Sequence, residues 1–468
     1  MNRVPLLVSM LCLATSSAFA EDLLAVYDRA LVNDPQIREA DATRLAARES
    51  RPQAWGTMLP QVSATASRQR DWSDGTGFQQ FVFGSNPPTT SQSGGNSVNN
   101  TDAWRVTIRQ NVFSWANWMT LKASSHQVAQ AEANYLVARQ SLAQRVAQQY
   151  FAVLNARDVV DANEAARDAY ARQLDQAEKR FEVGLIAITD VQQARAARDT
   201  SAANVIVAKR TMANAEEQLR ATVGDRFATL NKPSDAMPLA SPQPSNEEDW
   251  VKTSMDQNAA LTASRLAADI ARDQVQVQFS GHLPTVDLVA GRTYSDANGN
   301  RVLGTTVTNS ASEAYGKSVS LQVTVPIFSG GNTQSRVRQS QYSWIAAKER
   351  LERSSRETER LARDSYLGVI SGISQVQALK QALASSQTAM KATEAGYEVG
   401  TSTIVDVLTS RGQLMQAQTN YSQALYAYMN SLIQLRLASG DLDRGTIEEV
   451  NKWLTEAVQA NGRSVAKP

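Results

Sequence analysis

The side chains that most often carry acid–base or metal chemistry are few in this sequence, or lack the spacing that such chemistry requires. His126 and His282 are the only histidines, and neither belongs to a ligand pattern such as H-E-x-x-H. Serine, aspartate and glutamate occur throughout, but no G-x-S-x-G, P-loop or G-x-G-x-x-G motif surrounds them. We therefore expect no catalytic residue, no cofactor-binding residue and no metal site, and the sequence does not predict an enzyme.

The first twenty residues have the three parts of a secretion signal peptide. Arg3 gives a basic start, a mainly apolar stretch follows as far as Leu13, and Ala18 and Ala20 form a small-x-small cleavage site. The only cysteine, Cys12, lies inside this segment. We expect a signal peptide over residues 1–20 and a secreted chain without disulfides.

The remaining sequence holds no run of 18 or more apolar residues, so it predicts no helix that spans a bilayer. The chain carries 47 basic and 46 acidic side chains, for a formal net charge of +1. This balance gives no reason to expect nucleic acid as a partner.

The chain contains the same unit twice. Phe181, Gly184 and Asp190 reappear 216 residues later as Tyr397, Gly400 and Asp406. A proline-rich stretch separates the two copies and is not expected to be helical. The predicted domains are therefore a first repeat over 21–225, a linker over 226–249, a second repeat over 250–441 and a C-terminal segment over 442–468.

Apolar residues spaced seven apart predict long helices that pack side by side as coiled coils. Val369, Val376 and Met390 belong to such a series in the second copy. The pattern predicts one helix over 115–181 and one over 332–397, each roughly 100 Å long at 1.5 Å per residue. Shorter returning helices are expected from Thr189 and from Thr403. The apolar stripe is thin, which suits helices that are wet on one side.

Four segments between the helices alternate apolar and polar residues, as the strands of a membrane barrel do. They lie around Val62–Ser67, Trp104–Val112, Val286–Leu288 and Val319–Ile327. A soluble hairpin would show the same alternation in each strand alone. We expect long polar loops between the strands of each pair, over 71–102 and over 295–314.

Four strands cannot close a barrel, and an open sheet edge cannot face lipid. The chain must therefore assemble with copies of itself. Two copies would give a barrel filled by its own side chains, whereas three would leave room for a passage. The sequence favours a closed homo-oligomer without counting its subunits.

The sequence resembles the TolC family of outer-membrane efflux and type I secretion channels over nearly its whole secreted length. The most specific segments are Val183–Gly184–Leu185 followed by residues 187–192, residues 397–407, and residues 325–331. The resemblance implies a mostly α-helical protomer with a β-barrel portion and internal duplication. Three copies would form a 12-stranded outer-membrane β-barrel, continued by a 12-helix periplasmic α-barrel with a mixed α/β equatorial belt.

The resemblance also implies a channel gate at the periplasmic tip. Tyr397 and Asp190 match a hydrogen-bonded pair between neighbouring coils, and Asp406 matches a residue that faces the constriction. Ser402 stands where enterobacterial members have an arginine, and Thr409 stands where they have a second acidic residue. The gate set implied by the family is Thr189, Asp190, Tyr397, Ser402 and Asp406.

Six residues at the same tips match the positions where the family docks its adaptor: Val183, Gly184, Leu185, Val399, Gly400 and Thr401. The implied function is a passive exit duct of a tripartite export system, which carries drugs, small molecules or secreted proteins. The implied partners are two further copies of the chain, a periplasmic adaptor (membrane fusion) protein, an inner-membrane transporter of the RND or ABC type, and outer-membrane lipid. The implied location is the outer membrane of a Gram-negative bacterium, with an extension into the periplasm.

Simpler interpretations accompany these expectations. Thr189 with Asp190, and Thr403 with Asp406, stand where helices begin and have the spacing of caps. Tyr397 continues a heptad series and fits a core position. At the level of function, a trimeric periplasm-spanning scaffold or adhesin without a pore is the alternative, although four alternating strands fit it poorly.

Overall fold

The computed structural model describes residues 21–81, 89–225, 227, 229–234, 237–303 and 306–459. The predicted signal peptide, residues 1–20, lies outside the described residues. The chain forms two compact units. The first holds the described residues of Met1–Arg44, Ala131–Ser264 and Leu351–Pro468, and the second holds those of Leu45–Gln130 and Arg265–Arg350.

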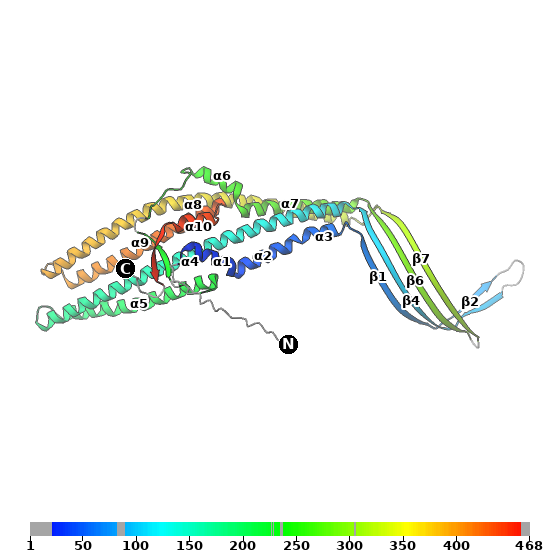
Figure 1. The fold of residues 1–468 in the computed structure, drawn as a ribbon, viewed down its shortest axis with the longest axis horizontal. Helices are drawn as coiled ribbons and strands as arrows, with labels where there is room; N and C mark the ends of the chain where they lie inside the picture. The colour runs from blue at the N-terminus through cyan, green and yellow to red at the C-terminus, as the bar shows by residue number, and fades with distance from the viewer. Residues whose placement is uncertain are drawn as a thin grey trace, which may run out of the picture. The chain divides into compact units, whose positions relative to one another are not determined.

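Four long helices carry the repeated pattern. They are α4 (Trp115–Glu182), α5 (Ile188–Val223), α8 (Asn332–Glu398) and α9 (Ile404–Ser439). α4 and α8 have 68 and 67 residues, and α5 and α9 have 36 each. The heptad series therefore predicted both ends of α4 and α8, and the starts of α5 and α9, to within two residues. In the first unit, α5 returns alongside α4 and α9 returns alongside α8 (Figure 1).

The heptad residues form the core of the first unit. Val153, Val160, Val369 and Val376 are all buried. Around them the core is completed by aromatic and large apolar side chains, among them Tyr27, Tyr150, Phe151, Tyr428 and Met429. Burying such side chains contributes about 1.5–3 kcal/mol each.

A mixed α/β region surrounds this core, as the fold-class prediction required. It contains α1 (Leu23–Asn33), the start of α2 (Pro35–Arg48), α6 (Glu247–Gln257) and α10 (Arg444–Asn451). Strand β5 (Thr229–Pro233) comes from the predicted linker and pairs with β8 (Leu454–Gln459) from the C-terminal segment. The Tyr150 hydroxyl donates a hydrogen bond of 2.6 Å to the carbonyl of Asn231, which ties β5 to α4.

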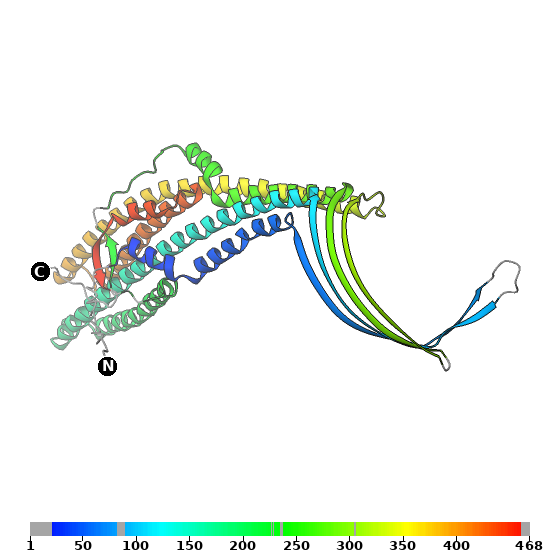
Figure 2. The same cartoon turned by 45° about the vertical axis from the view of Figure 1, so that its right-hand side comes forward.

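The second unit contains a four-stranded antiparallel sheet in the order β1–β4–β6–β7 (Figure 2). The strands are β1 (Gln61–Ser73), β4 (Asn96–Phe113), β6 (Thr285–Leu303) and β7 (Thr306–Thr324). Short helices α3 (Ser50–Gly56) and η1 (Ser280–His282), together with α7 (Ala259–Phe279), precede the strands. Strand alternation therefore predicted the correct four segments.

The prediction of long polar loops was wrong. Residues 295–314 continue β6 and β7 almost to their connection, and β6 pairs with β7 from Thr285↔Thr324 to Leu303↔Thr306. Between β1 and β4, the hairpin of β2 (Thr76–Phe81) and β3 (Thr89–Gly94) occupies part of the predicted loop. Serine, threonine and asparagine suggested loops, but pairing with the neighbouring strand outweighs local composition here.

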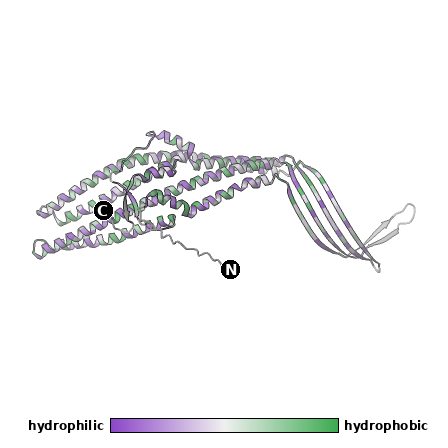
Figure 3. Cartoon of the chain, viewed as in Figure 1, coloured by the Kyte–Doolittle hydropathy of each residue, from purple (hydrophilic) through white to green (hydrophobic). Residues whose placement is uncertain are grey.

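The two faces of the sheet differ sharply in polarity. Large exposed apolar side chains alternate along β7 at Val319, Leu321 and Val323, and Leu288 and Ile108 lie on the same face by register. The alternation is visible as changes of colour along the strands (Figure 3). We call this the apolar face of the sheet.

None of the helices in the described ranges is both long and apolar enough to cross a membrane.

Candidate gate at the hairpin tips

Two helical hairpins of the first unit carry the residues predicted to form a gate. The first hairpin is α4 with α5, and the second is α8 with α9. Each turns through a glycine with positive φ, Gly184 at +75° and Gly400 at +83°. A Cβ atom would meet nothing within 4 Å at either position, so glycine is required here for backbone conformation alone.

An arginine–glutamate ion pair closes each hairpin near its tip. Arg195 of α5 lies 2.8 Å from Glu178 of α4. The equivalent residues of the second copy, Arg411 and Glu394, form the same pair between α9 and α8. Since the duplication preserves both pairs, the helices of each hairpin are held in the same register.

Asp406 caps α9. The Thr403 backbone N–H and hydroxyl donate to the Asp406 carboxylate at 2.9 and 2.7 Å, and the Asp406 N–H donates to the Thr403 hydroxyl. This is the capping box expected from the spacing, and that interpretation is confirmed. The hydrogen bonds from Thr403, first from its side chain and then from its backbone, lower the pKa of Asp406. The carboxylate is therefore charged at neutral pH.

Asp190 is placed differently, and the capping interpretation was wrong for it. The N-cap of α5 is Ala187, which offers no side-chain hydrogen bond. Ala187 stands where the second copy has Thr403, so the first copy lacks the hydroxyl that would hold the carboxylate. Among the described residues, Asp190 has no ion pair and no side-chain hydrogen bond, and Thr189 is exposed. Asp190 is free to bind a partner from outside the protomer.

Tyr397 packs in a small core of the second hairpin with Met390, Ile404 and Val407. Its hydroxyl is buried and has no hydrogen-bond partner among the described residues, so it is not bonded to Asp190 within the protomer. A buried polar group without a partner costs about 1–3 kcal/mol. Such a group calls for an explanation, because most buried polar atoms in native proteins are paired.

Arg180 contacts the ring of Tyr397 from the other hairpin. Its guanidinium carbon lies 4.6 Å from the ring centroid, within the range of a cation–π interaction. The equivalent position in the second copy is Gly396, whose missing side chain leaves room for the loop at Ser402. Arg180 thus breaks the symmetry of the repeat and joins the two hairpins at their tips.

A second contact joins the hairpins further from the tips. The Tyr170 hydroxyl of α4 donates a hydrogen bond of 3.3 Å to the carbonyl of Leu408 in α9. Neither Arg180 nor Tyr170 was identified from the sequence. The sequence could have pointed to them, because the two copies of the repeat differ at these positions. The second copy has Gly396 in place of Arg180 and Ser386 in place of Tyr170.

The residues predicted to dock an adaptor are apolar and exposed. Val183, Leu185 and Val399 expose 69%, 73% and 77% of their surface. Gly184, Gly400 and Thr401 complete the two turns, in which the Thr401 N–H donates to the carbonyl of Gly396 at 2.8 Å. Exposed apolar side chains that gather in a patch are typical of a protein-binding surface.

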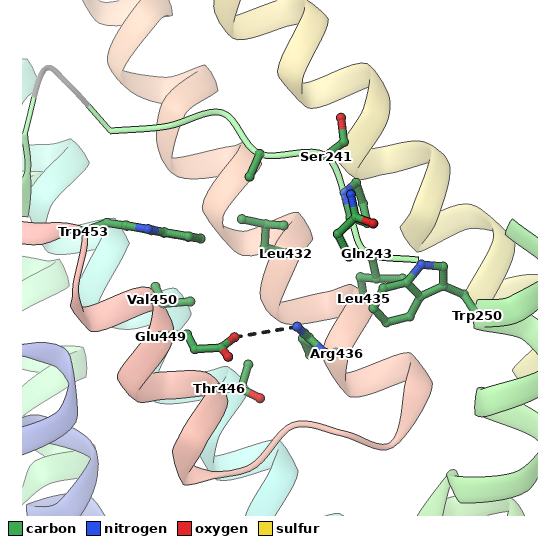
Figure 4. Close-up of a pocket in the computed structure, with 12 residues that line it drawn as sticks. Ser241, Gln243, Trp250, Leu432, Leu435, Arg436, Thr446, Glu449, Val450 and Trp453 are labelled. Atoms are coloured by element: carbon green, nitrogen blue, oxygen red, sulfur yellow. Dashed lines mark ion pairs between the residues drawn. The ribbon is translucent and has the colours of Figure 1, made fainter. Parts of the chain in front are cut away.

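A cavity of about 190 Å³ lies elsewhere in the first unit, with Trp250 and Trp453 at opposite sides of it (Figure 4). Arg436 lies between them, 3.6 Å from Glu449 and 2.9 Å from Asp441. Its guanidinium also lies over the Trp250 ring at 5.5 Å. Because these contacts satisfy Arg436, we assign it a structural role.

His126 lies beside an ion pair of Lys122 and Asp273 in the second unit. Its Nδ1 lies 2.9 Å from the buried carboxylate of Asp273, and Lys122 lies 3.1 Å from the other oxygen. The described residues contain no group of three or more histidine, cysteine, aspartate and glutamate side chains that could hold a metal ion.

Comparisons with known proteins agree with this architecture. The family model described as "Outer membrane efflux protein" matches residues 26–225 and 250–441. The chain is 34% identical to Outer membrane protein TolC of Escherichia coli K12, over 99% of this chain and 91% of that protein. It is 26% identical to the Alkaline protease secretion protein AprF of Pseudomonas aeruginosa, over 94% of this chain and 89% of that protein.

A solved structure shows the same fold. The CmeC outer membrane channel of Campylobacter jejuni matches with a TM-score of 0.70 at 19% identity, over 93% of this chain and 90% of that one. Family membership rests on the sequence matches, which cover almost the whole chain. The chain therefore belongs to the TolC family of outer membrane efflux proteins, and it is a non-enzymatic channel protein of the outer membrane that extends into the periplasm.

Proposed function

We propose that three copies of this chain close into one passive exit duct, gated by the hairpin tips. The observation that carries the proposal is the sheet. Strands β1 and β7 are at its edges, and each pairs with only one neighbour. Because an unpaired edge is not tolerated in lipid, each edge must pair with another copy. Three copies give twelve strands, enough to enclose a passage.

Exposed apolar residues beside the sheet support assembly. After β7, Ile327 and Phe328 expose 95% and 88% of their surface. Exposing large apolar side chains to water costs free energy, about 25 cal/mol for each Å² of apolar surface. A neighbouring copy that covers them would remove this cost.

We base the proposed gate on two tip residues whose polar groups have no hydrogen-bond partner within the protomer. Asp190 has a carboxylate without a partner, and Tyr397 has a buried hydroxyl without one. We infer that the two groups bond when the tips of the assembled trimer close, as the family resemblance suggests. Asp406 keeps its charge while it caps α9, so three copies would place a ring of carboxylates at the opening. Rings of fixed charge set ion selectivity in a constriction.

Arg180 supplies the cation that Ser402 cannot. Ser402 is half-buried against Gly396 and carries no charge. Arg180 reaches Tyr397 across the hairpins, and a cation–π contact contributes about 0.5–2 kcal/mol according to its exposure. Three such contacts would hold the tips together and still allow a docked partner to separate them.

The partners are proposed from the tips and from the family. The exposed residues around Val183, Leu185 and Val399 provide an apolar docking surface for the helical hairpin of a periplasmic adaptor. The adaptor would connect the duct to an inner-membrane transporter of the RND or ABC type. A relative is named as a protease secretion protein, which supports proteins as cargo beside drugs and small molecules.

Resting conductance in planar bilayers tests the gate. Arg180→Gln removes the cation above the Tyr397 ring, so we expect a higher resting conductance than in the unchanged protein. Tyr397→Phe keeps the ring and deletes the hydroxyl, and it should also raise conductance if the bond to Asp190 forms. Arg172→Gln is the matched control, because Arg172 is an exposed arginine of the same helix that makes no ion pair, hydrogen bond or cation–π contact with the second hairpin among the described residues.

The outcomes separate the two contacts. If Arg180→Gln conducts no more than Arg172→Gln does, the cation–π contact has no part in closure. If Tyr397→Phe conducts at the unchanged level while Arg180→Gln conducts more, the tyrosine hydroxyl is a core group and Arg180 acts on its ring alone.

A further inference from the structure

Two cations lie on the apolar face of the sheet. The register pairs Arg292 of β6 with Lys317 of β7, directly across the two strands. One row nearer the helical end of the strands are Ala290 and Val319, and one row further away are Tyr294 and Tyr315. Side chains two residues apart on a strand point to the same face. Arg292 and Lys317 therefore share their face with the apolar residues.

Neither cation is neutralised by the protein. Both side chains are exposed, and neither has an ion pair within the part of the chain that the structure describes. Arg292 contacts an aromatic ring, since its guanidinium carbon lies 5.9 Å from the Trp104 ring centroid. Like charges directly opposite each other in a sheet repel. The pair is therefore unfavourable unless an anion lies between the two side chains.

The length of strand β6 indicates how deep Arg292 and Lys317 lie in the membrane. Arg292 is seven residues beyond Thr285, where β6 begins beside the helices, or roughly 23 Å along the strand at 3.3 Å per residue. Barrel strands are tilted by about 35–45°, so this length corresponds to a height of about 16–19 Å. The apolar band of a membrane barrel is about 25 Å tall and ends in a girdle of aromatic residues. Trp104, Tyr294 and Tyr315 form such a girdle one row beyond Arg292, with stacked and tilted ring contacts. The cations thus lie in the outer part of the band, one row inside the aromatic girdle.

The charged residues nearby determine from which side an anion can approach Arg292 and Lys317. Beyond the aromatic row, the next row on this face carries Asp296 and Glu313, together with Asp102 in a 3.4 Å ion pair with Arg68. Asp296 and Glu313 have no ion pair among the described residues and would repel an anion, so it must approach Arg292 and Lys317 from the apolar side. Long basic side chains can extend from an apolar surface toward lipid headgroups.

We propose that Arg292 and Lys317 bind the phosphate of a phosphorylated lipid in the outer leaflet. The guanidinium and ammonium groups donate hydrogen bonds to the phosphate oxygens, and the acyl chains lie against Val319 and Leu321. Charge-assisted bonds from arginine to phosphate are among the strongest that a protein makes. A lipid is assigned rather than free phosphate because the anion and the apolar surface lie on one continuous face.

Native mass spectrometry of the purified full-length protein tests the site with a defined probe. The probe is a bis-phosphorylated acylated disaccharide lipid, and its dephosphorylated form is the comparison. The test variant is Arg292→Gln with Lys317→Gln. The control variant is Arg105→Gln with Arg109→Gln, which removes two arginines of the same sheet whose register places them on the opposite face.

We expect the test variant to lose at least about tenfold in affinity for the phosphorylated lipid, equivalent to roughly 1.4 kcal/mol. The control variant should bind as the unchanged protein does, and excess inorganic phosphate should not displace the lipid. Equal binding of the dephosphorylated lipid would overturn the proposal, because acyl chains alone would then explain binding. An equal loss in the control variant, or displacement by inorganic phosphate, would also overturn it.

Discussion

At the scale of single residues, the informative positions are those where the two copies of the repeat differ. Ala187 and Thr403 are equivalent, but only Thr403 has a hydroxyl, so Asp406 is held as a cap and Asp190 is not. Arg180 and Gly396 are also equivalent, and only the arginine reaches the other hairpin. We propose that this asymmetry in a few side chains gives the duplicated architecture its gate.

Single-residue roles were the least predictable from sequence. The capping box of Thr403 and Asp406 follows from local spacing, and it was predicted correctly. The contact between Arg180 and Tyr397 joins residues far apart in the chain, so no local pattern contains it. The same holds for Tyr170 and the carbonyl of Leu408.

A prediction at this scale concerns Asp406. Three copies of its carboxylate at the opening should favour cations, so Asp406→Asn should weaken cation selectivity, measured as the reversal potential under a salt gradient. Hydrogen bonds from Thr403 lower the pKa of Asp406, so the charged form is present above the ordinary carboxyl range and is lost only as pH falls below that range.

The unchanged protein should therefore show constant selectivity between about pH 6 and 8, well above the ordinary aspartate pKa of about 3.9. Unaltered reversal potentials in a folded Asp406→Asn trimer would leave Asp406 with no role beyond capping α9.

At the scale of elements, helices were predicted more accurately than the connections between strands. The heptad series predicted α4, α5, α8 and α9 because the same apolar spacing recurs over many turns. A single atypical residue therefore does not hide the pattern. The segments 71–102 and 295–314 were predicted as loops because their residues favour turns. In the structure most of their backbone pairs in the β-ladders, which depends on the neighbouring strand rather than on local composition.

Substitutions at two glycines with the same backbone conformation test how closely the elements around them pack. Gly400 and Gly440 have φ of +83° and +81°. A Cβ at Gly400 would meet open space, whereas one at Gly440 would lie 2.5 Å from the carbonyl oxygen of Gln257. Gly400→Ala should cost only the strain of a left-handed residue, about 1–2 kcal/mol. Gly440→Ala should destabilise the protein more, because the end of α9 must also move away from the backbone at the end of α6.

Thermal unfolding of the detergent-solubilised protein measures this difference. The expected order of Tm is the unchanged protein, then Gly400→Ala, then Gly440→Ala. If Gly440→Ala were no less stable than Gly400→Ala, the close packing of the end of α9 against Gln257 would be refuted.

At the scale of the whole molecule, the protomer is incomplete in a way that its own sequence reveals. Its sheet has two unpaired edges and an apolar face, and large apolar side chains at Ile327 and Phe328 are uncovered. The domain boundaries at 225, 249 and 441 remain predictions. The number of subunits also remains a prediction, because four strands require closure but do not state how many copies provide it.

The most direct test of the central claim, that three copies form one conducting duct, is single-channel recording in planar bilayers of purified protein after cross-linking has counted its subunits. The account predicts a cross-linked trimer that gives discrete conductance steps, and steps that become larger when Arg180→Gln releases the hairpin tips. A monodisperse monomer, or a trimer that carries no current at any voltage, would contradict it.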